Sequence, residues 1–126
     1  MGMHFTKLTV TTTGTAGSAT GSAETEEPIE GEVMRVDVDY NASCPGTDVL
    51  TLKSKTTGNA VREQTIITES GSATDFTRFP TIQHQEPDGS TRTSYGPFPV
   101  CGTLTAEMSS SDALSPAATI GILWRD

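Results

Sequence analysis

The feature that most constrains the fold of this chain is a repeated alternation of apolar and polar residues over short segments. Successive side chains of a β-strand point to opposite faces, so a strand with one buried face alternates in this way. Five segments show the pattern clearly: residues 29–40, 49–53, 61–69, 100–108 and 117–125. Turn-forming residues separate these segments and none has a convincing helical period, which predicts an all-β domain.

Three weaker segments add to this set. They are residues 5–13, 19–24 and 81–85. Together the segments predict seven to nine mostly antiparallel strands in a single-domain β-sandwich or small β-barrel that spans residues 1–126. Residues 1–6 are expected to form a flexible N-terminal arm, and residues 73–99, where the alternation fades, a long loop region.

The pattern also predicts facing and pairing for individual strands. In residues 29–40 the side chains expected to share one face are Met34, Val36, Val38 and Tyr40. Residues 49–53 and 61–69 should form a hairpin around Thr57-Gly58-Asn59. Residues 100–108 should pair with residues 117–125 across the loop at 109–116.

Charge and the N-terminal sequence limit the classes of function. The chain has 8 basic and 16 acidic residues and a net charge of −8, which argues against binding nucleic acid or an anionic membrane through a basic surface. The N-terminus has no secretory signal, and no apolar run approaches the length of a membrane span. We therefore expect synthesis in a cytoplasm, where Cys44 and Cys101 should be thiols unless the fold brings their strands together.

The residues that carry chemistry are sparse. Asp37, Asp39 and Asp48 could supply oxygen ligands to calcium, but they lack the glycine-containing loop of calcium motifs and are expected to be solvated surface groups. His4 and His84 have no second His or Cys near them in the sequence. Since no nucleophile is marked beside a base, we expect no enzymatic activity, no metal and no cofactor.

A contact surface is the better expectation. Phe76, Arg78 and Phe79 lie in a region that cannot easily bury two phenylalanines locally, so they are candidates for partner contacts, or alternatively for capping one open end of the sandwich. Trp124 should instead lie in the core beside Ile120 and Ile122. The five glutamates between residues 24 and 32 are expected to be a solvated edge, with contact to a basic partner as the alternative.

The order of several motifs adds a resemblance to a known class of protein. The motifs begin with Lys7-Leu8-Thr9-Val10-Thr11 and the strand at residues 31–40 and continue with Thr65-Ile66-Ile67-Thr68 and a Phe79-Pro80 turn. They end with the segments at residues 98–104 and 120–124. This series, which covers residues 7–124, resembles the small decoration, or cement, proteins encoded beside the major capsid protein in tailed bacteriophages.

The resemblance implies a non-enzymatic virion protein on the outer surface of a capsid, made in the host cytoplasm and stabilising the shell. It implies the major capsid protein as partner and a homotrimeric state. Contacts to the capsid or to neighbouring subunits would come from the N-terminal segment, with His4 and Phe5, or from the region that holds Phe76, Arg78 and Phe79. The alternatives are a tail or head-to-tail module of a phage, and an immunoglobulin-like or carbohydrate-binding β-module.

Overall fold

A computed structural model describes residues 2–56, 63–71 and 73–126, and within them nine β-strands and no helix. The strands are β1 Met3–Val10, β2 Ala19–Glu24, β3 Ile29–Tyr40, β4 Val49–Thr56, β5 Glu63–Ser70, β6 Phe76–Arg78, β7 Thr81–Gln85, β8 Thr91–Ser111 and β9 Ala118–Arg125. All strand pairs are antiparallel. The predicted all-β antiparallel fold is confirmed.

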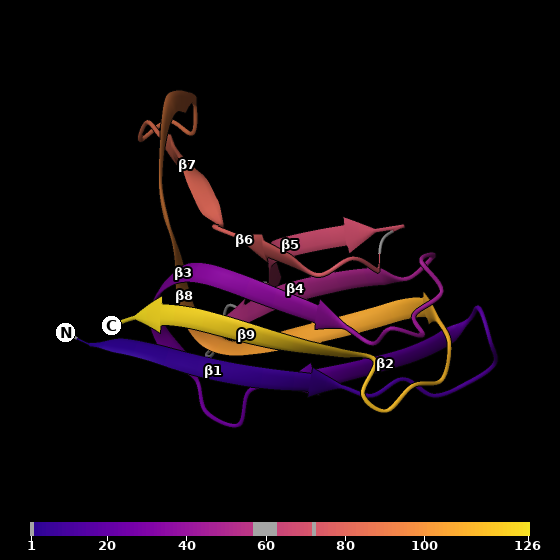
Figure 1. The fold of residues 1–126 in the computed structure, drawn as a ribbon. Helices are drawn as coiled ribbons and strands as arrows, with labels where there is room; N and C mark the ends of the chain where they lie inside the picture. Colours follow the sequence, from indigo (N-terminus) through magenta and orange to yellow (C-terminus); the bar gives the residue numbers. More distant parts are fainter. Residues whose placement is uncertain (1, 57–62, 72) are drawn as a thin grey trace.

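The strands form one continuous sheet that folds over into two layers (Figure 1). The first layer contains β1, β9, β3 and β6 in that order, and the second contains β2, β8, β4 and β5. The layers are joined where the first residues of β3, Ile29–Val33, pair with Phe98–Gly102 of β8. This arrangement is a β-sandwich in which one pair of strands forms the corner.

The core lies between the two layers. Its completely or almost completely buried side chains come from both of them, with Val36, Val38, Ile120 and Ile122 from the first and Leu50, Leu52, Leu104 and Met108 from the second. Trp124 is half-buried and packs against this cluster, at the end of the row that begins with Ile120 and Ile122. The alternation in the sequence therefore identified most of the core.

Met34 is an exception to that alternation. Val33 pairs with Trp124 and Arg35 pairs with Leu123, so Met34 is an extra residue at a β-bulge. As a result Val33 and Val36, three residues apart, are both buried, while Met34 is only half-buried. The prediction that Met34 shares the core face with Val36 was wrong, because strict alternation assumes an uninterrupted ladder.

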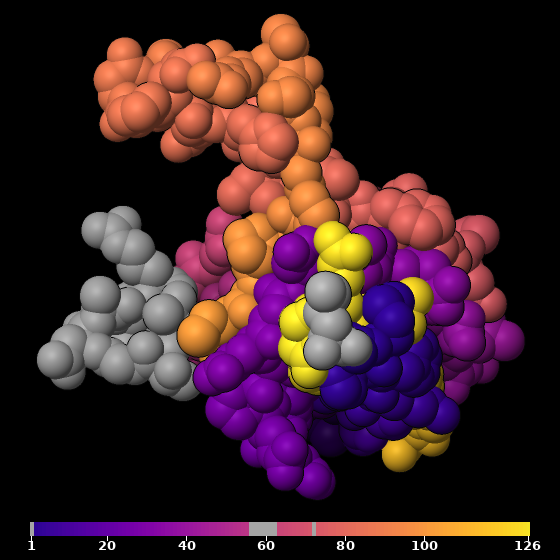
Figure 2. All heavy atoms as spheres, turned by 90° about the vertical axis from the view of Figure 1, so that its left-hand side faces the viewer, coloured from indigo at the N-terminus to yellow at the C-terminus, as the bar shows by residue number. Residues whose placement is uncertain are grey.

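Residues 73–99 are not the long loop that was expected. They contain β6, β7 and the first residues of β8, and β7 pairs with β8 to form a two-stranded arm, residues 81–97, that rises from the sandwich (Figures 1 and 2). Its turn is Pro87-Asp88-Gly89, with Gly89 at φ 90°, a conformation that favours glycine.

Met3–Thr6, expected within a flexible arm, are paired with β9 as the start of β1. The segment at 117–125 pairs with β1 and β3 and not with β8, because the chain crosses between layers after Ser111. The hairpin of β4 and β5 is confirmed, although its predicted turn at 57–59 lies outside the described residues.

No helix in the described part of the chain is long and apolar enough to span a membrane.

A paired substitution tests the position of the core. Leu104 is completely buried, so Leu104→Ala should lower the free energy of unfolding by about 2–5 kcal/mol through lost burial and the cavity that remains. Phe79 is 69 % exposed, so Phe79→Ala in dilute protein should change it by less than about 0.5 kcal/mol. Urea unfolding followed by Trp124 fluorescence measures both, and equal losses would contradict the assignment of the core.

Candidate functional site

At one end, the outward face of the first layer carries a row of side chains that is apolar except for one arginine. Phe5 of β1 is opposite Leu123 of β9, which is opposite Arg35 of β3, and directly opposed residues share a face. The neighbouring row begins with Met3, and both Met3 and Phe5 are more than half exposed. Phe5 lies across Gly121, where an added Cβ would meet its ring, so the missing side chain makes room for the aromatic group.

The same face ends in a hollow at the root of the arm. Met34, Phe79, Pro80, Tyr95 and Pro97 line it together with Val33, Thr81 and Gly96, and its volume is about 320 Å³. Phe79 and Tyr95 are 69 % and 60 % exposed. The bulge contributes directly, because it turns Met34 outward beside Arg35. We call Met3, Phe5, Met34, Phe79, Tyr95 and Leu123 the apolar patch.

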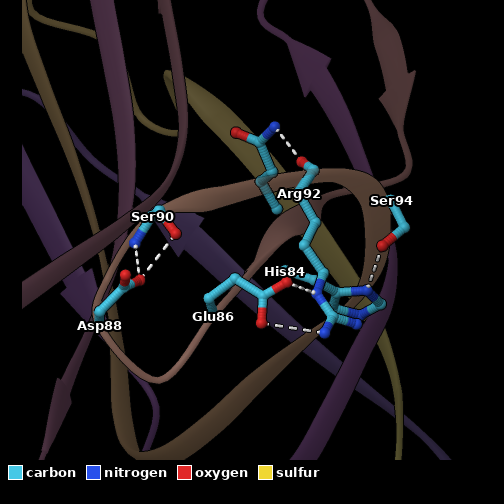
Figure 3. A network of polar contacts seen from close by, with 7 residues as sticks. His84, Glu86, Asp88, Ser90, Arg92 and Ser94 are labelled. Carbon is cyan, nitrogen blue, oxygen red and sulfur yellow. Dashed lines mark hydrogen bonds and ion pairs between the residues drawn. The ribbon is translucent and has the colours of Figure 1, made fainter.

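Above the hollow, polar pairs across the two strands fix the arm (Figure 3). Arg92 donates from Nε and Nη2 to the two carboxylate oxygens of Glu86, at 2.6 and 3.0 Å. His84 Nδ1 lies 2.9 Å from the Ser94 hydroxyl, and the Gln83 amide donates to the Arg92 carbonyl at 2.5 Å. Most arm side chains are exposed, so these pairs, rather than an apolar core, hold its shape.

The turn of the arm has its own polar contacts. The Ser90 hydroxyl and amide donate to Asp88 Oδ1 at 2.7 and 3.0 Å, and the Gly89 amide donates to the Glu86 carbonyl at 2.9 Å. The bonds from Ser90, the hydroxyl first, lower the pKa of Asp88 below its ordinary value because they stabilise the carboxylate.

Of the predicted contact residues, the structure places Phe5 and Phe79 on the outward face. His4 points the other way, since its ring stacks on Trp124 with centroids 4.3 Å apart and its Nε2 lies 3.0 Å from Asp126 Oδ2. Trp124 donates from Nε1 to the Thr6 hydroxyl at 3.0 Å. One side of the indole is thereby covered, which leaves less of it available for stacking on a sugar ring.

Phe76 and Arg78 instead close the open edge of the sandwich. The guanidinium carbon of Arg78 lies 4.6 Å from the centre of the Phe76 ring, and Arg78 Nη2 donates to Glu69 Oε2 of β5 at 2.7 Å. Phe76 in turn packs against Tyr40, with ring centroids 6.2 Å apart. Because both side chains have partners within the molecule, we leave them out of the candidate surface.

The acidic residues that were expected on the surface separate into two environments. Asp37 and Asp39 lie on the outward face, and Asp37 accepts hydrogen bonds from Arg35 and Thr77. Asp48 is only 1 % exposed, so its expected solvation was wrong. Its position follows from the chain packing against β5, where the Gly71 amide donates to the Asp48 carbonyl. Among the described residues no cluster of three or more His, Cys, Asp or Glu could hold a metal ion.

The neighbourhood of Asp48 holds two other titratable groups. Burial, and next the Asp48 carboxylate, raise the pKa of Cys44 to about 11. The same two causes raise the pKa of Tyr40. Both groups therefore stay protonated at neutral pH, and Cys44 lacks the thiolate character of a reactive cysteine. Cys44 and Cys101 are free thiols.

Four residues of the patch, Met3, Met34, Tyr95 and Leu123, were not named as contact residues from the sequence, although Met3 lies in the N-terminal segment that was expected to make contacts. Tyr95 was assigned to a loop, although the segments on either side of Pro87-Asp88-Gly89 carry the signal of a hairpin. Met34 was assigned to the core by alternation, and the sequence carries no evident sign of the bulge.

The comparisons with known proteins leave the chain unassigned. No family model and no curated protein matches the sequence. Among solved structures, a mutant of a family 29 carbohydrate-binding module is similar at 13 % identity and a TM-score of 0.37, covering 98 % of this chain and 81 % of that one. A TM-score this low carries no argument about function.

The lowered pKa of Asp88, in the turn of the arm, can be tested by titration. A carboxyl with a lowered folded pKa contributes stability above its ordinary range, and that contribution is lost as the pH falls through the folded value. The titration midpoint of Asp88 followed by NMR should therefore lie below that of an unstructured peptide. Ser90→Ala should raise the midpoint, whereas the matched loss of a hydroxyl in Ser94→Ala should not. An unchanged midpoint in Ser90→Ala would contradict the assigned hydrogen bonds.

Proposed function

We propose that this chain is a non-enzymatic structural protein that binds the outer surface of a tailed-phage capsid and stabilises the shell, as decoration proteins do. The proposal rests on the resemblance of its motifs to that class and, in the structure, on the arm. No other element of the described chain stands so far from the core (Figures 1 and 2).

Keeping the arm ordered costs free energy, because it extends from the sandwich as an isolated two-stranded ribbon. A two-stranded ribbon is at best marginally stable in water, and this one buries few of its side chains. Its Glu86–Arg92 pair and the contacts around Asp88 nevertheless hold it in one shape. An element that is ordered before binding loses little conformational entropy on docking, which favours a role in binding a partner.

The capsid surface is the partner that this proposal assigns to the arm. Residues 83–95 carry Glu86, Asp88 and Arg92 as their charged groups and otherwise present mainly amides and hydroxyls. Such a surface suits hydrogen bonding to exposed polypeptide more than a strongly charged ligand. Since each copy would bind only the assembled shell, many weak contacts would shift the equilibrium toward that shell.

The first experiment measures copy number in density-purified virus particles by quantitative mass spectrometry. A ratio of this chain to the major capsid protein on the order of one supports decoration, because symmetric shells repeat each contact. A few copies per particle would favour the tail or head-to-tail module, and absence from the particle would reject the proposal.

Shortening the arm tests the assigned contact. Replacing residues 84–94 by Asn-Gly joins the paired residues Gln83 and Tyr95 through a two-residue turn and leaves the sandwich intact. When mixed with particles assembled without the protein, the shortened form should cosediment at least about tenfold less than the intact chain.

The control for this experiment is Ser18→Ala, in the turn at the opposite end of the molecule, which should cosediment like the intact chain. Unfolding followed by Trp124 fluorescence checks that both variants fold. Equal cosedimentation of the shortened and intact forms would remove the arm from the capsid contact.

A further inference from the structure

We propose that the free edge of β1 binds an extended, basic segment of another protein as an added antiparallel strand. The site is a groove along the open edge of the sandwich, between β1 and residues 23–29, with a volume of about 640 Å³. We call it the edge groove. It lies on the side of the sandwich away from the arm (Figure 1), so this contact is separate from the capsid contact proposed above.

One wall of the edge groove is the outer edge of β1. Residues 6–9 line it, and among the described strands β1 pairs only with β9, on its other side. The Gly2 carbonyl accepts from the Asp126 amide, so these opposed residues are a hydrogen-bonded pair. Because such pairs alternate along an antiparallel ladder, the backbone N–H and C=O groups of Lys7 and Thr9 point away from β9. They offer donors and acceptors to a further strand.

The opposite wall is acidic, and the second layer holds it in place. Glu24, Glu26 and Glu27 line it, and within the described residues none of their carboxylates has an ion pair or a hydrogen bond. Thr25, between them, is buried. Its amide donates to the Leu104 carbonyl at 2.9 Å, and its hydroxyl accepts from the Leu104 amide at 3.1 Å. The segment is therefore fixed before a partner arrives, which lowers the entropy lost on binding.

The charges around the edge groove favour a basic partner. Besides the three glutamates, the lining includes Lys7, which strand alternation places on the outward face with Phe5. His4 also lines it, with Nε2 3.0 Å from Asp126 Oδ2. With His4 neutral, the lining has a net charge of 1 − 3 = −2, and the exposed Glu30 just beyond it adds to this sign. Unpaired carboxylates attract the side chains of lysine and arginine.

The alternation of a strand specifies the sequence that fits. Side chains of an added strand point alternately to the inner side of the groove, beside Thr6 and Leu8, and to the outward face, beside Phe5. Lysine or arginine is expected at the inner positions, toward the acidic wall, and an apolar β-former such as valine at the outer ones. Residues 3–9 leave room for a segment of about seven residues.

The probe is a capped seven-residue peptide that alternates lysine and valine. Its binding to the purified chain is measured by calorimetry and by the fluorescence of Trp124, which lines the groove. A dissociation constant of about 1 mM or lower is expected. The peptide with N-methylated valines keeps its charge but loses the backbone donors that face β1, so it should bind at least about tenfold more weakly. A peptide with glutamate in place of lysine should also bind at least about tenfold more weakly.

Substitutions test each wall separately. Lys7→Pro removes the outward N–H and should weaken binding at least about tenfold relative to Lys7→Ala, which removes the same charge and keeps the N–H. Glu24→Gln/Glu26→Gln should weaken binding at least about fivefold. Its control, Glu63→Gln/Asp88→Asn, removes the same charge from β5 and from the turn of the arm and should bind like the intact chain.

Hydrogen exchange of the intact chain, followed by NMR, requires no variant. The amides of Lys7 and Thr9 should exchange rapidly in the free chain and become protected when the lysine–valine peptide is added. Absence of binding at about 1 mM peptide would overturn the proposal. Equal binding of the N-methylated peptide would also overturn it, because attraction between charges would then be sufficient. No capsid is present in these measurements, so their failure and that of the copy-number experiment are distinguishable.

Discussion

The pairing of Ile29–Val33 with Phe98–Gly102 is the constraint on which the rest of the structure depends. It joins the two layers by backbone hydrogen bonds, and its buried residues Ile29, Val33, Phe98 and Val100 belong to the core between them. It also lets both strands continue beyond the corner. β8 extends backward into the arm, and β3 pairs with β9 on both sides of the bulge at Met34 and with β6 beyond it. The arm and the bulge at Met34 therefore both lie directly beside this junction.

The sequence predicted the class of the fold and most of the core because alternation reports burial directly, as at Val36, Val38, Ile120 and Ile122. It did not predict which strands pair, since alternation says nothing about partners. The segment at 117–125 was therefore paired with 100–108 when its partners are β1 and β3. In the arm, the strand at 81–85 was predicted, but its partner at the start of β8 was missed because that segment is exposed on both faces and alternates weakly.

The candidate surface was predictable in part, for a related reason. Phe79 was identified as an apolar residue that local burial would not easily absorb, and Phe5 as part of the N-terminal segment to which the resemblance assigns contacts; both are exposed. Phe76 was indistinguishable from Phe79 in the sequence, yet Phe76 lies opposite the buried Val38 and points inward to Tyr40, whereas Phe79 lies three residues further on and is exposed. In a strand of three residues, the register of pairing decides which side chains point inward, and here Val38 lies opposite Phe76. That register is set by the folded sheet and cannot be read from the short segment alone.

The arm and the apolar patch share a boundary at the hollow. Tyr95 belongs to the arm and lines the hollow, and Pro80 and Pro97 lie where the arm leaves the sandwich. A partner side chain that fills the hollow would pack against the root of the arm and restrict its direction. Filling the hollow would thereby add to the order that the polar pairs of the arm already give it. This ordering requires no conformational switch, because the patch and the arm are already in place in the single chain.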